Sequence, residues 1–165
     1  MACLTLEVAQ GEVPMSQTSL DLNDYGFSTQ IRVRLSETDA VGIVFFGSFA
    51  SYFDVGRMDY LAHLGLEGFG GKVRDLIPGA VVAQRARFHS PARYNDILIM
   101  NVRVSRIGTT SYTFEFLVNN KRSRARVATG DLSLVWLDED FLPMAVPKGF
   151  RDVVAQFEGE RLCTT

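Results

Sequence analysis

The sequence predicts an α+β fold in which a curved antiparallel sheet of about five strands wraps around one long central helix. Three observations predict it: a segment that alternates polar and apolar residues, a long segment with helical spacing, and four strand-like segments joined by short turns. The 165 residues, 47% of them hydrophobic and 22% charged, suffice for one domain with a buried core. We therefore expect a single folded domain.

The first strand and the helix show two different periods. Residues 30–35, Gln-Ile-Arg-Val-Arg-Leu, alternate with a period of two, which is typical of a strand with one buried face. From Ser48 to Leu64 the apolar residues recur at spacings of three and four, as on the buried face of a helix. We expect Ser48 to be the N-cap of this helix and Gly65 to end it.

Four further strands are predicted after the helix, at residues 80–88, 97–105, 111–119 and 124–137. Turn residues separate them, at Ser90-Pro91 to Asn95-Asp96, at Gly108 and around Asn119-Asn120-Lys121. Strands that are joined this briefly must be antiparallel. Pro147 opens a short helix over residues 148–157.

The domain organisation follows from where these patterns begin and end. Residues 1–28 show no sustained period and are predicted to be a flexible N-terminal extension, with at most one short strand at residues 4–8. Residues 29–158 form the single domain, and residues 159–165 a C-terminal tail. Residues 66–79 are rich in glycine and are predicted to be a connecting loop.

Composition excludes several classes of protein. A formal net charge of -2 argues against a general nucleic-acid binder, which normally carries a basic surplus. Charged residues recur throughout, so no membrane span is expected, and no secretory signal is apparent. The two cysteines, Cys3 and Cys163, lie near the termini and predict no disulfide framework, which favours the cytoplasm. Two histidines far apart offer no metal-ligand spacing, so we expect no metal site.

One motif lies between the first strand and the helix. Glu37-Thr38-Asp39-Ala40-Val41-Gly42, followed by an apolar run that enters the helix, resembles the signature of the 4-hydroxybenzoyl-CoA thioesterase branch of the hot-dog superfamily. Residues 88–96 and 104–108 resemble two further segments of that family, and the resemblance covers residues 29–147. It implies a hot-dog fold and hydrolysis of an acyl-CoA thioester without a cofactor, since CoA is part of the substrate.

The residue types of this motif suit thioester hydrolysis. Free backbone N–H groups at the start of a helix, here those of Phe46 and Gly47, can polarise a carbonyl oxygen. A carboxylate on the loop before that helix, Asp39, can attack the carbonyl carbon or activate a water. By resemblance, Asp39 takes the family's catalytic position and Phe46 the carbonyl-polarising one. Whether the aspartate acts as nucleophile or as general base stays open.

Further residues are candidates for substrate binding. The aromatic residues Phe45, Phe49 and Tyr52 are individually typical of a core, but as a group they can line an acyl or aryl pocket beside the helix. Related proteins use basic residues near the turn before Ser111 for CoA, which makes Arg106 the local candidate for its phosphates.

Structural roles compete with these interpretations. Without the family context, Asp39 is more typical of a turn or cap residue. Glu37 is expected to hold the loop, and His63 and His89 are expected to be structural.

Two alternative functions stay open. One is an acyl-carrier-protein thioesterase of a fatty-acid, polyketide or quinone pathway, and the other is a non-catalytic acyl-CoA-binding hot-dog module. By resemblance we expect a homo-oligomer, a tetramer built as a dimer of dimers, in which edge strands pair. Asp59, Gln84 or Thr110 of a second copy are then candidates to complete the site.

Overall fold

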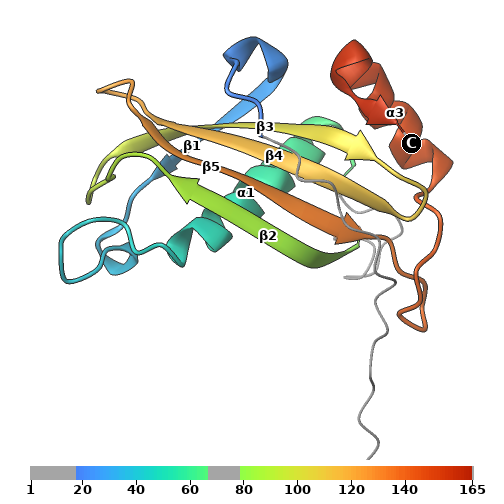
Figure 1. The fold of residues 1–165 in the computed structure, drawn as a ribbon, viewed down its shortest axis with the longest axis horizontal. Coiled ribbons are helices and arrows are strands. Elements are labelled where there is room, and N and C mark those ends of the chain that lie inside the picture. Colours follow the sequence, from blue (N-terminus) through green and yellow to red (C-terminus); the bar gives the residue numbers. More distant parts are fainter. Residues whose placement is uncertain (1–17, 67–78, 165) are drawn as a thin grey trace, which may run out of the picture.

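The computed structural model describes residues 18–66 and 79–164, which form one curved antiparallel sheet packed on a long helix (Figure 1). The five main strands are β1 (Phe27–Arg32), β2 (Ala80–Phe88), β3 (Ile97–Ile107), β4 (Ser111–Asn120) and β5 (Arg126–Val135). They lie in the order β1-β3-β4-β5-β2, and every neighbouring pair is antiparallel. The predicted α+β architecture is therefore confirmed.

Helix α1 (Ser48–His63) crosses one face of this sheet, which we call the inner face. Phe53 of the helix stacks on Phe116 of β4, with ring centroids 4.5 Å apart. Gly56 permits the close approach, because a Cβ there would clash with the sulfur of Met100. Gly130 of β5 lies beneath the Phe53 ring, where a Cβ would clash with that ring. Close packing of the helix on the sheet therefore depends on glycine at two positions.

Helix α3 (Lys148–Glu158) packs beside the C-terminal half of α1. The Tyr60 hydroxyl donates to Glu158 Oε1 at 2.5 Å, and the backbone N–H of Val104 donates to the same oxygen at 3.1 Å. Burial raises the pKa of Glu158, and these hydrogen bonds oppose that rise. The chain continues through a 3-10 turn (Gly159–Arg161) to β6 (Cys163–Thr164), which pairs parallel with β3. Residues 159–164 are thus built into the fold, whereas a tail was predicted.

Several boundaries differ from the prediction: β3, β4, β5 and α3 begin and end within two residues of it, and the differences at β1 and α1 adjoin the motif. Strand β1 begins at Phe27 and ends at Arg32, because the backbone of Val33 bonds to Asp96 and Asn95 of the loop after β2 rather than continuing the β1 ladder. The N-cap of α1 is Gly47, so the prediction of Ser48 as cap is wrong by one residue. The hydroxyl of Ser48 donates instead to the backbone oxygen of Glu37 at 3.1 Å.

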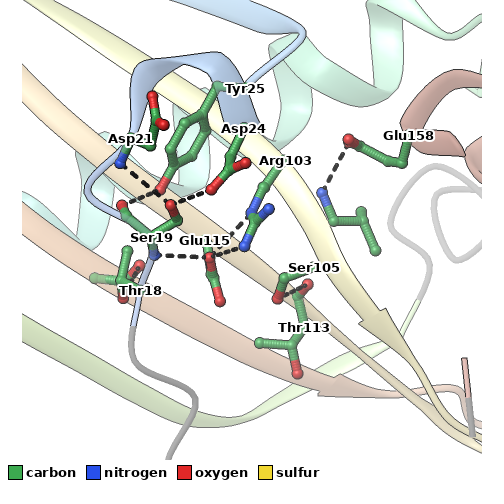
Figure 2. Close-up of polar contacts among 12 residues, drawn as sticks. Thr18, Ser19, Asp21, Asp24, Tyr25, Arg103, Ser105, Thr113, Glu115 and Glu158 are labelled. Carbon is green, nitrogen blue, oxygen red and sulfur yellow. Dashed lines mark hydrogen bonds and ion pairs between the residues drawn. The ribbon is translucent and has the colours of Figure 1, made fainter. Parts of the chain in front are cut away.

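Residues 18–26, which we call the N-terminal arm, lie on the outer face of the sheet, opposite α1 (Figure 2). The N–H of Ser19 donates to Glu115 Oε2 at 3.2 Å, and the Tyr25 hydroxyl donates to the backbone oxygen of Ser19 at 2.9 Å. The Tyr25 ring covers the guanidinium of Arg103. Residues 18–28, which were predicted to belong to a flexible extension, therefore pack on the sheet or form the start of β1. Residues 1–17, with the strand considered at residues 4–8, lie outside the described residues.

A row of charges runs across four strands beneath and beside this arm. Cross-strand register places Arg103, Glu115, Asp131 and Arg85 side by side on the outer face. Arg103 bonds to Glu115 at 2.8 Å, and Arg85 bonds to Asp131 at 3.0 Å. Burial raises the pKa of Asp131, the bonds from Arg85 oppose that rise, and the neighbouring Glu115 adds to it.

Candidate active site

Residues 38–44 form a tight loop directly before α1. Thr38 and Val44 pair as an isolated antiparallel bridge, and the N–H of Asp39 donates to the oxygen of Ile43 at 2.9 Å. Gly42 closes the turn with a φ of +81°, a conformation that favours glycine. Val44 donates to the backbone oxygen of Ala92 at 2.8 Å, which ties the loop to the segment after β2. The motif therefore folds as a pinned loop with Asp39 at its base.

The two carboxylate oxygens of Asp39 differ in their surroundings. Oδ1 accepts hydrogen bonds from the N–H groups of Val41 at 2.8 Å and Ile43 at 3.4 Å. Oδ2 accepts none from any residue that the structure describes, and the side chain is half-buried. The turn-residue role of Asp39 is thus carried by one oxygen. The other stays available for chemistry.

Glu37 braces the same loop. Its Oε2 accepts from the N–H of Arg34 at 2.7 Å and from the hydroxyl of Tyr52 at 2.8 Å. Its backbone oxygen accepts from the N–H of Phe45 at 2.9 Å. Burial, and then the hydrogen bond to Glu37, raise the pKa of Tyr52. The predicted loop-holding role of Glu37 is confirmed.

The start of α1 offers unused donors. The N–H groups of Ser48, Phe49 and Ala50 already donate to backbone oxygens, at 2.9, 3.2 and 3.2 Å. The N–H groups of Phe46 and Gly47 find no acceptor within residues 18–66 and 79–164. These two donors lie at the positive end of the helix dipole, where an oxygen that develops negative charge is stabilised.

Gly47 is required at this point for its lack of a side chain rather than for an unusual backbone. Its φ of -64° and ψ of -24° are helical, so any residue could adopt them. A Cβ at Gly47, however, would lie 2.5 Å from the ring of Phe45. The glycine therefore lets the Phe45 ring lie against the helix start.

The predicted substrate-binding aromatics separate into two groups. Phe45 and Phe46 are 45% and 67% exposed, and their ring centroids lie 4.4 Å apart. Phe49 and Tyr52 are 3% and 2% exposed and belong to the core of the described subunit. Phe45 is therefore the aromatic that remains accessible to a ligand beside Asp39, together with Phe46, which was predicted only for its N–H.

Arg106 lies at the other end of the sheet. It pairs with Thr113 and Cys163 near the end of β3, whereas the Asp39 loop is tied to Ala92, before β3 begins. Figure 1 shows β3 running from the end where α1 starts to the far end of the sheet. A single copy of the chain does not bring Arg106 and Asp39 together.

The remaining predicted residues have structural contacts. Asp59 accepts from the Thr29 hydroxyl at 2.6 Å, and His89 Nε2 lies 3.0 Å from the Thr129 hydroxyl. The pKa of His89 is lowered by burial first and then by nearby arginines. His63 lies against the ring of Phe27. Gln84 lies on β2, and Thr110 follows β3 in the turn to β4.

Sequence reasoning assigned no role to Arg57 of α1. Its side chain is buried, its Nε donates to Asp54 at 2.7 Å, and its Nη1 is buried without an acceptor in the described chain. The sequence signals were its place in the helix segment that resembles the family signature and its spacing from Asp54, which suits an ion pair on one helix face. No group of three histidine, cysteine or acidic residues in the described ranges could hold a metal ion, and no helix there is long and apolar enough to cross a membrane.

The sheet and its central helix have the architecture of the hot-dog fold. A thioesterase from Thermus thermophilus, solved with coenzyme A and Zn, has the same fold, with a TM-score of 0.72 and 22% identity over 84% of this chain and 99% of that one. A family model described as the Thioesterase superfamily matches residues 41–125. The chain belongs to that family, and its class of activity is thioester hydrolysis.

Two curated relatives are similar over most of the chain. The acyl-CoA thioester hydrolase YbgC of Escherichia coli is 25% identical over 83% of this chain and 99% of its own length. The chloroplastic acyl-acyl carrier protein thioesterase ATL3 of Arabidopsis thaliana is 23% identical over 78% of this chain and 67% of its own. The family match begins two residues after Asp39, so the role of Asp39 depends on the geometry of its own loop.

Proposed function

We propose that the chain hydrolyses an acyl or aryl thioester of CoA to the free acid and CoA at the Asp39 loop. The observation that carries the proposal is that, among the described residues, Asp39 on this loop keeps one carboxylate oxygen unbonded and the helix start that follows keeps two N–H groups unbonded. Acyl transfer requires both kinds of group, a nucleophile or base and a donor set for the oxyanion.

The steps follow from these groups. The carbonyl oxygen of the thioester accepts from the N–H of Phe46 and Gly47, which stabilise the negative charge that develops on it. Asp39 Oδ2 then attacks the carbonyl carbon, the carbon–sulfur bond breaks, and CoA leaves as a thiolate that takes a proton from solvent; water then hydrolyses the anhydride to the free acid and the Asp39 carboxylate. Alternatively, Asp39 Oδ2 takes a proton from a water that attacks the same carbon, the carbon–sulfur bond breaks, and the leaving thiolate takes that proton. In both routes Val41 and Ile43 hold Oδ1 and thereby orient the carboxylate.

A second copy of the chain is part of the proposal. Strand β2 is an edge strand that pairs with β5 alone among the described strands, and Val81 and Val82 on it are exposed. Antiparallel pairing of two β2 strands would set the Ala80 end of one copy beside the Phe88 end of the other. Val135 of β5 pairs with Ala80 of β2 on one side and with Ser111 of β4 on the other. The Ala80 end of β2 therefore lies at the same end of the sheet as Arg106.

This pairing would bring Arg106 of a second copy toward the Asp39 loop, where it could bind a phosphate of CoA. We therefore propose a homo-oligomer, a dimer of dimers as in the prediction, with the site at the subunit boundary. The cytoplasm is the proposed compartment, on cysteine usage alone.

The test is thiol release from short, long and aromatic acyl-CoAs by the wild type, by Asp39→Asn and by a control, Asp152→Asn on the exposed face of α3. We expect Asp39→Asn to lose at least about a hundredfold in turnover, the usual contribution of a nucleophile or general base. The control should retain wild-type turnover. Equal turnover of Asp39→Asn and wild type on every hydrolysed substrate would refute the assignment.

The similarity to an acyl-acyl carrier protein thioesterase favours a second candidate substrate, an acyl group on a carrier protein. Rates on matched CoA and carrier-protein thioesters of one acyl group distinguish the two. Tight acyl-CoA binding by the wild type without hydrolysis of either thioester would instead support a binding module.

A further inference from the structure

A groove with a volume of about 390 Å3 lies on the outer face of the sheet, beside the N-terminal arm and the turn between β4 and β5. It is separate from the Asp39 loop, none of whose residues lines it. The lining residues come from the arm, β3, β4, the turn and the start of β5, and are Leu20, Leu22, Ile99, Asn101, Leu117, Asn119, Asn120, Lys121, Arg124 and Arg126.

One side of the groove is apolar. Leu20 and Leu22 of the arm are both about half exposed, and Ile99 and Leu117 lie on the outer face of neighbouring strands. The arm that carries the two leucines is held to β4 by the bond from the Ser19 N–H to Glu115, which Figure 2 shows. Exposed leucines next to a groove favour a ligand with an apolar part.

The rim of the groove is cationic. Lys121, Arg124 and Arg126 line it, and its lining contains no carboxylate. Lys121 Nζ donates to the neutral amide oxygen of Gln30 at 3.1 Å, and none of these three cations forms an ion pair within the described chain. On the same face, by contrast, Arg103 and Arg85 are both paired with carboxylates. The surplus of positive charge is therefore local to the groove.

Arg126 adds an independent observation. Its Nε is buried and has no hydrogen-bond acceptor among the residues described. Buried donors in folded proteins are nearly always bonded, so Arg126 Nε is not held by an acceptor of the described chain in the way that Arg85 and Arg103 are held by carboxylates. Arg124 beside it adopts a φ of +63°, which is uncommon outside glycine, and Asn120 holds this turn through bonds from Arg122 and Ser123.

We propose that this groove binds an anionic amphiphile, with a carboxylate or phosphate head at Lys121, Arg124 and Arg126 and an apolar chain along Leu20, Leu22, Ile99 and Leu117. The head bonds to the ammonium group of Lys121 and to the guanidinium groups of Arg124 and Arg126. Charge-assisted bonds to guanidinium groups make this the strongest part of the contact. The site does not depend on the proposed thioesterase chemistry, because it shares no residue with the Asp39 loop.

The test is methyl NMR of the full chain carrying Asp39→Asn, titrated with octanoate, octyl phosphate and inorganic phosphate. We expect the methyl signals of Leu20, Leu22, Ile99 and Leu117 to shift on addition of an amphiphile. The two amphiphiles distinguish the sources of the head: stronger binding of octanoate assigns a carboxylate, and stronger binding of octyl phosphate assigns a phosphate. Inorganic phosphate should bind more weakly than octyl phosphate because it lacks the chain.

Variants then locate the head. Arg126→Met should weaken binding about tenfold, and Lys121→Met with Arg124→Met about a hundredfold, at about one charge-assisted bond per side chain. Arg122→Met is the matched control, since Arg122 is an exposed cation of the same turn that does not line the groove. It should bind like the parent chain.

A melting curve tests whether Arg126 is merely structural. Because its Nε has no partner to lose, Arg126→Met should leave the melting temperature of the ligand-free protein unchanged or raise it. The proposal is overturned if no amphiphile shifts the four methyl groups, or if Arg122→Met weakens binding as much as the groove variants do. It is also overturned if Arg126→Met lowers the melting temperature and leaves the affinity unchanged.

Discussion

The two ends of helix α1 are built in opposite ways. At its C-terminal end Tyr60 is fully buried, and its hydroxyl donates to Glu158 of α3 at 2.5 Å. Phe27 and Phe157 pack edge-on against the Tyr60 ring, at centroid distances of 5.8 and 5.7 Å. Apolar burial and a buried hydrogen bond both stabilise this end.

The N-terminal end leaves its polar groups unused. Phe46 and Gly47 keep N–H groups for which the described chain supplies no acceptor, and the rings of Phe45 and Phe46 are exposed. Asp39 uses one carboxylate oxygen to hold its loop and leaves the other unbonded. Under the proposed function, one helix separates two tasks, stability at its C-terminal end and thioester chemistry at its N-terminal end. Substitutions at the two ends should then affect different measurements.

The largest expected effect concerns the N-terminal end. Asp39→Asn should lower turnover at least about a hundredfold while it changes the free energy of unfolding by less than about 1 kcal/mol. The reason is that an asparagine Oδ1 can still accept from Val41 and Ile43, whereas its amide nitrogen can neither attack nor accept a proton. Paired measurements of turnover and urea unfolding check this. A large loss of stability would mean that the two ends are not separated.

The reverse pattern is expected at the C-terminal end. Tyr60→Phe removes the hydroxyl that bonds to buried Glu158, which should cost about 1.5–3 kcal/mol of unfolding free energy. Turnover at a temperature well below melting should stay within about twofold, since Tyr60 does not touch the loop. Tyr94→Phe, which removes an exposed hydroxyl, is the control and should alter neither quantity. A tenfold drop in turnover for Tyr60→Phe would contradict the comparison.

A smaller effect is expected for Gly47→Ala. The added Cβ would lie 2.5 Å from the partly exposed Phe45 ring, so the ring should turn away at little cost in stability. We expect kcat/KM to fall about three- to tenfold, because the aromatic beside the carbonyl-polarising N–H groups is displaced. In a Phe45→Ala background the same substitution should cause almost no further loss. An undiminished loss there would show that the ring is not the cause.

Local patterns were enough to predict much of this fold. The strand at residues 80–88 was predicted with its bounds and the start of α1 to within one residue, because period-two and three-four spacings report which face is buried. The shift of β1 was not predictable in this way, since Val33 continues the alternation and leaves the ladder only through bonds to Asn95 and Asp96. The N-terminal arm was missed for a similar reason: its anchor, Glu115, lies 96 residues away from Ser19.

The candidate site was predicted in part. The motif indicated the loop of Asp39 and the helix start at Phe46 and Gly47, and the structure places them in succession with donors and an oxygen unbonded. Tyr52 was predicted to bind substrate but is bonded to Glu37 in the described subunit, because spacing alone cannot distinguish a pocket wall from a core. A role for Arg126 could not be predicted from the sequence, since it is the burial of its unbonded Nε in the described chain that sets it apart from other arginines.

The smallest expected effect is a pH dependence that comes from the C-terminal end. The pKa of Glu158 is raised, chiefly by burial, above its ordinary value of 4.5. The folded chain therefore holds the Glu158 proton at pH values where the unfolded chain has lost it. The contribution of Glu158 to stability is fully present below pH 4.5 and is lost as pH rises through the folded-state pKa.

Glu158→Gln cannot titrate, yet its amide oxygen can still accept from Tyr60 and Val104. Urea unfolding of both proteins across this window should show a shallower fall for the variant. Asp131, whose pKa is also raised, contributes equally to both and cancels in their difference. Parallel curves would mean that Glu158 is ionised in the folded chain as it is in the unfolded one.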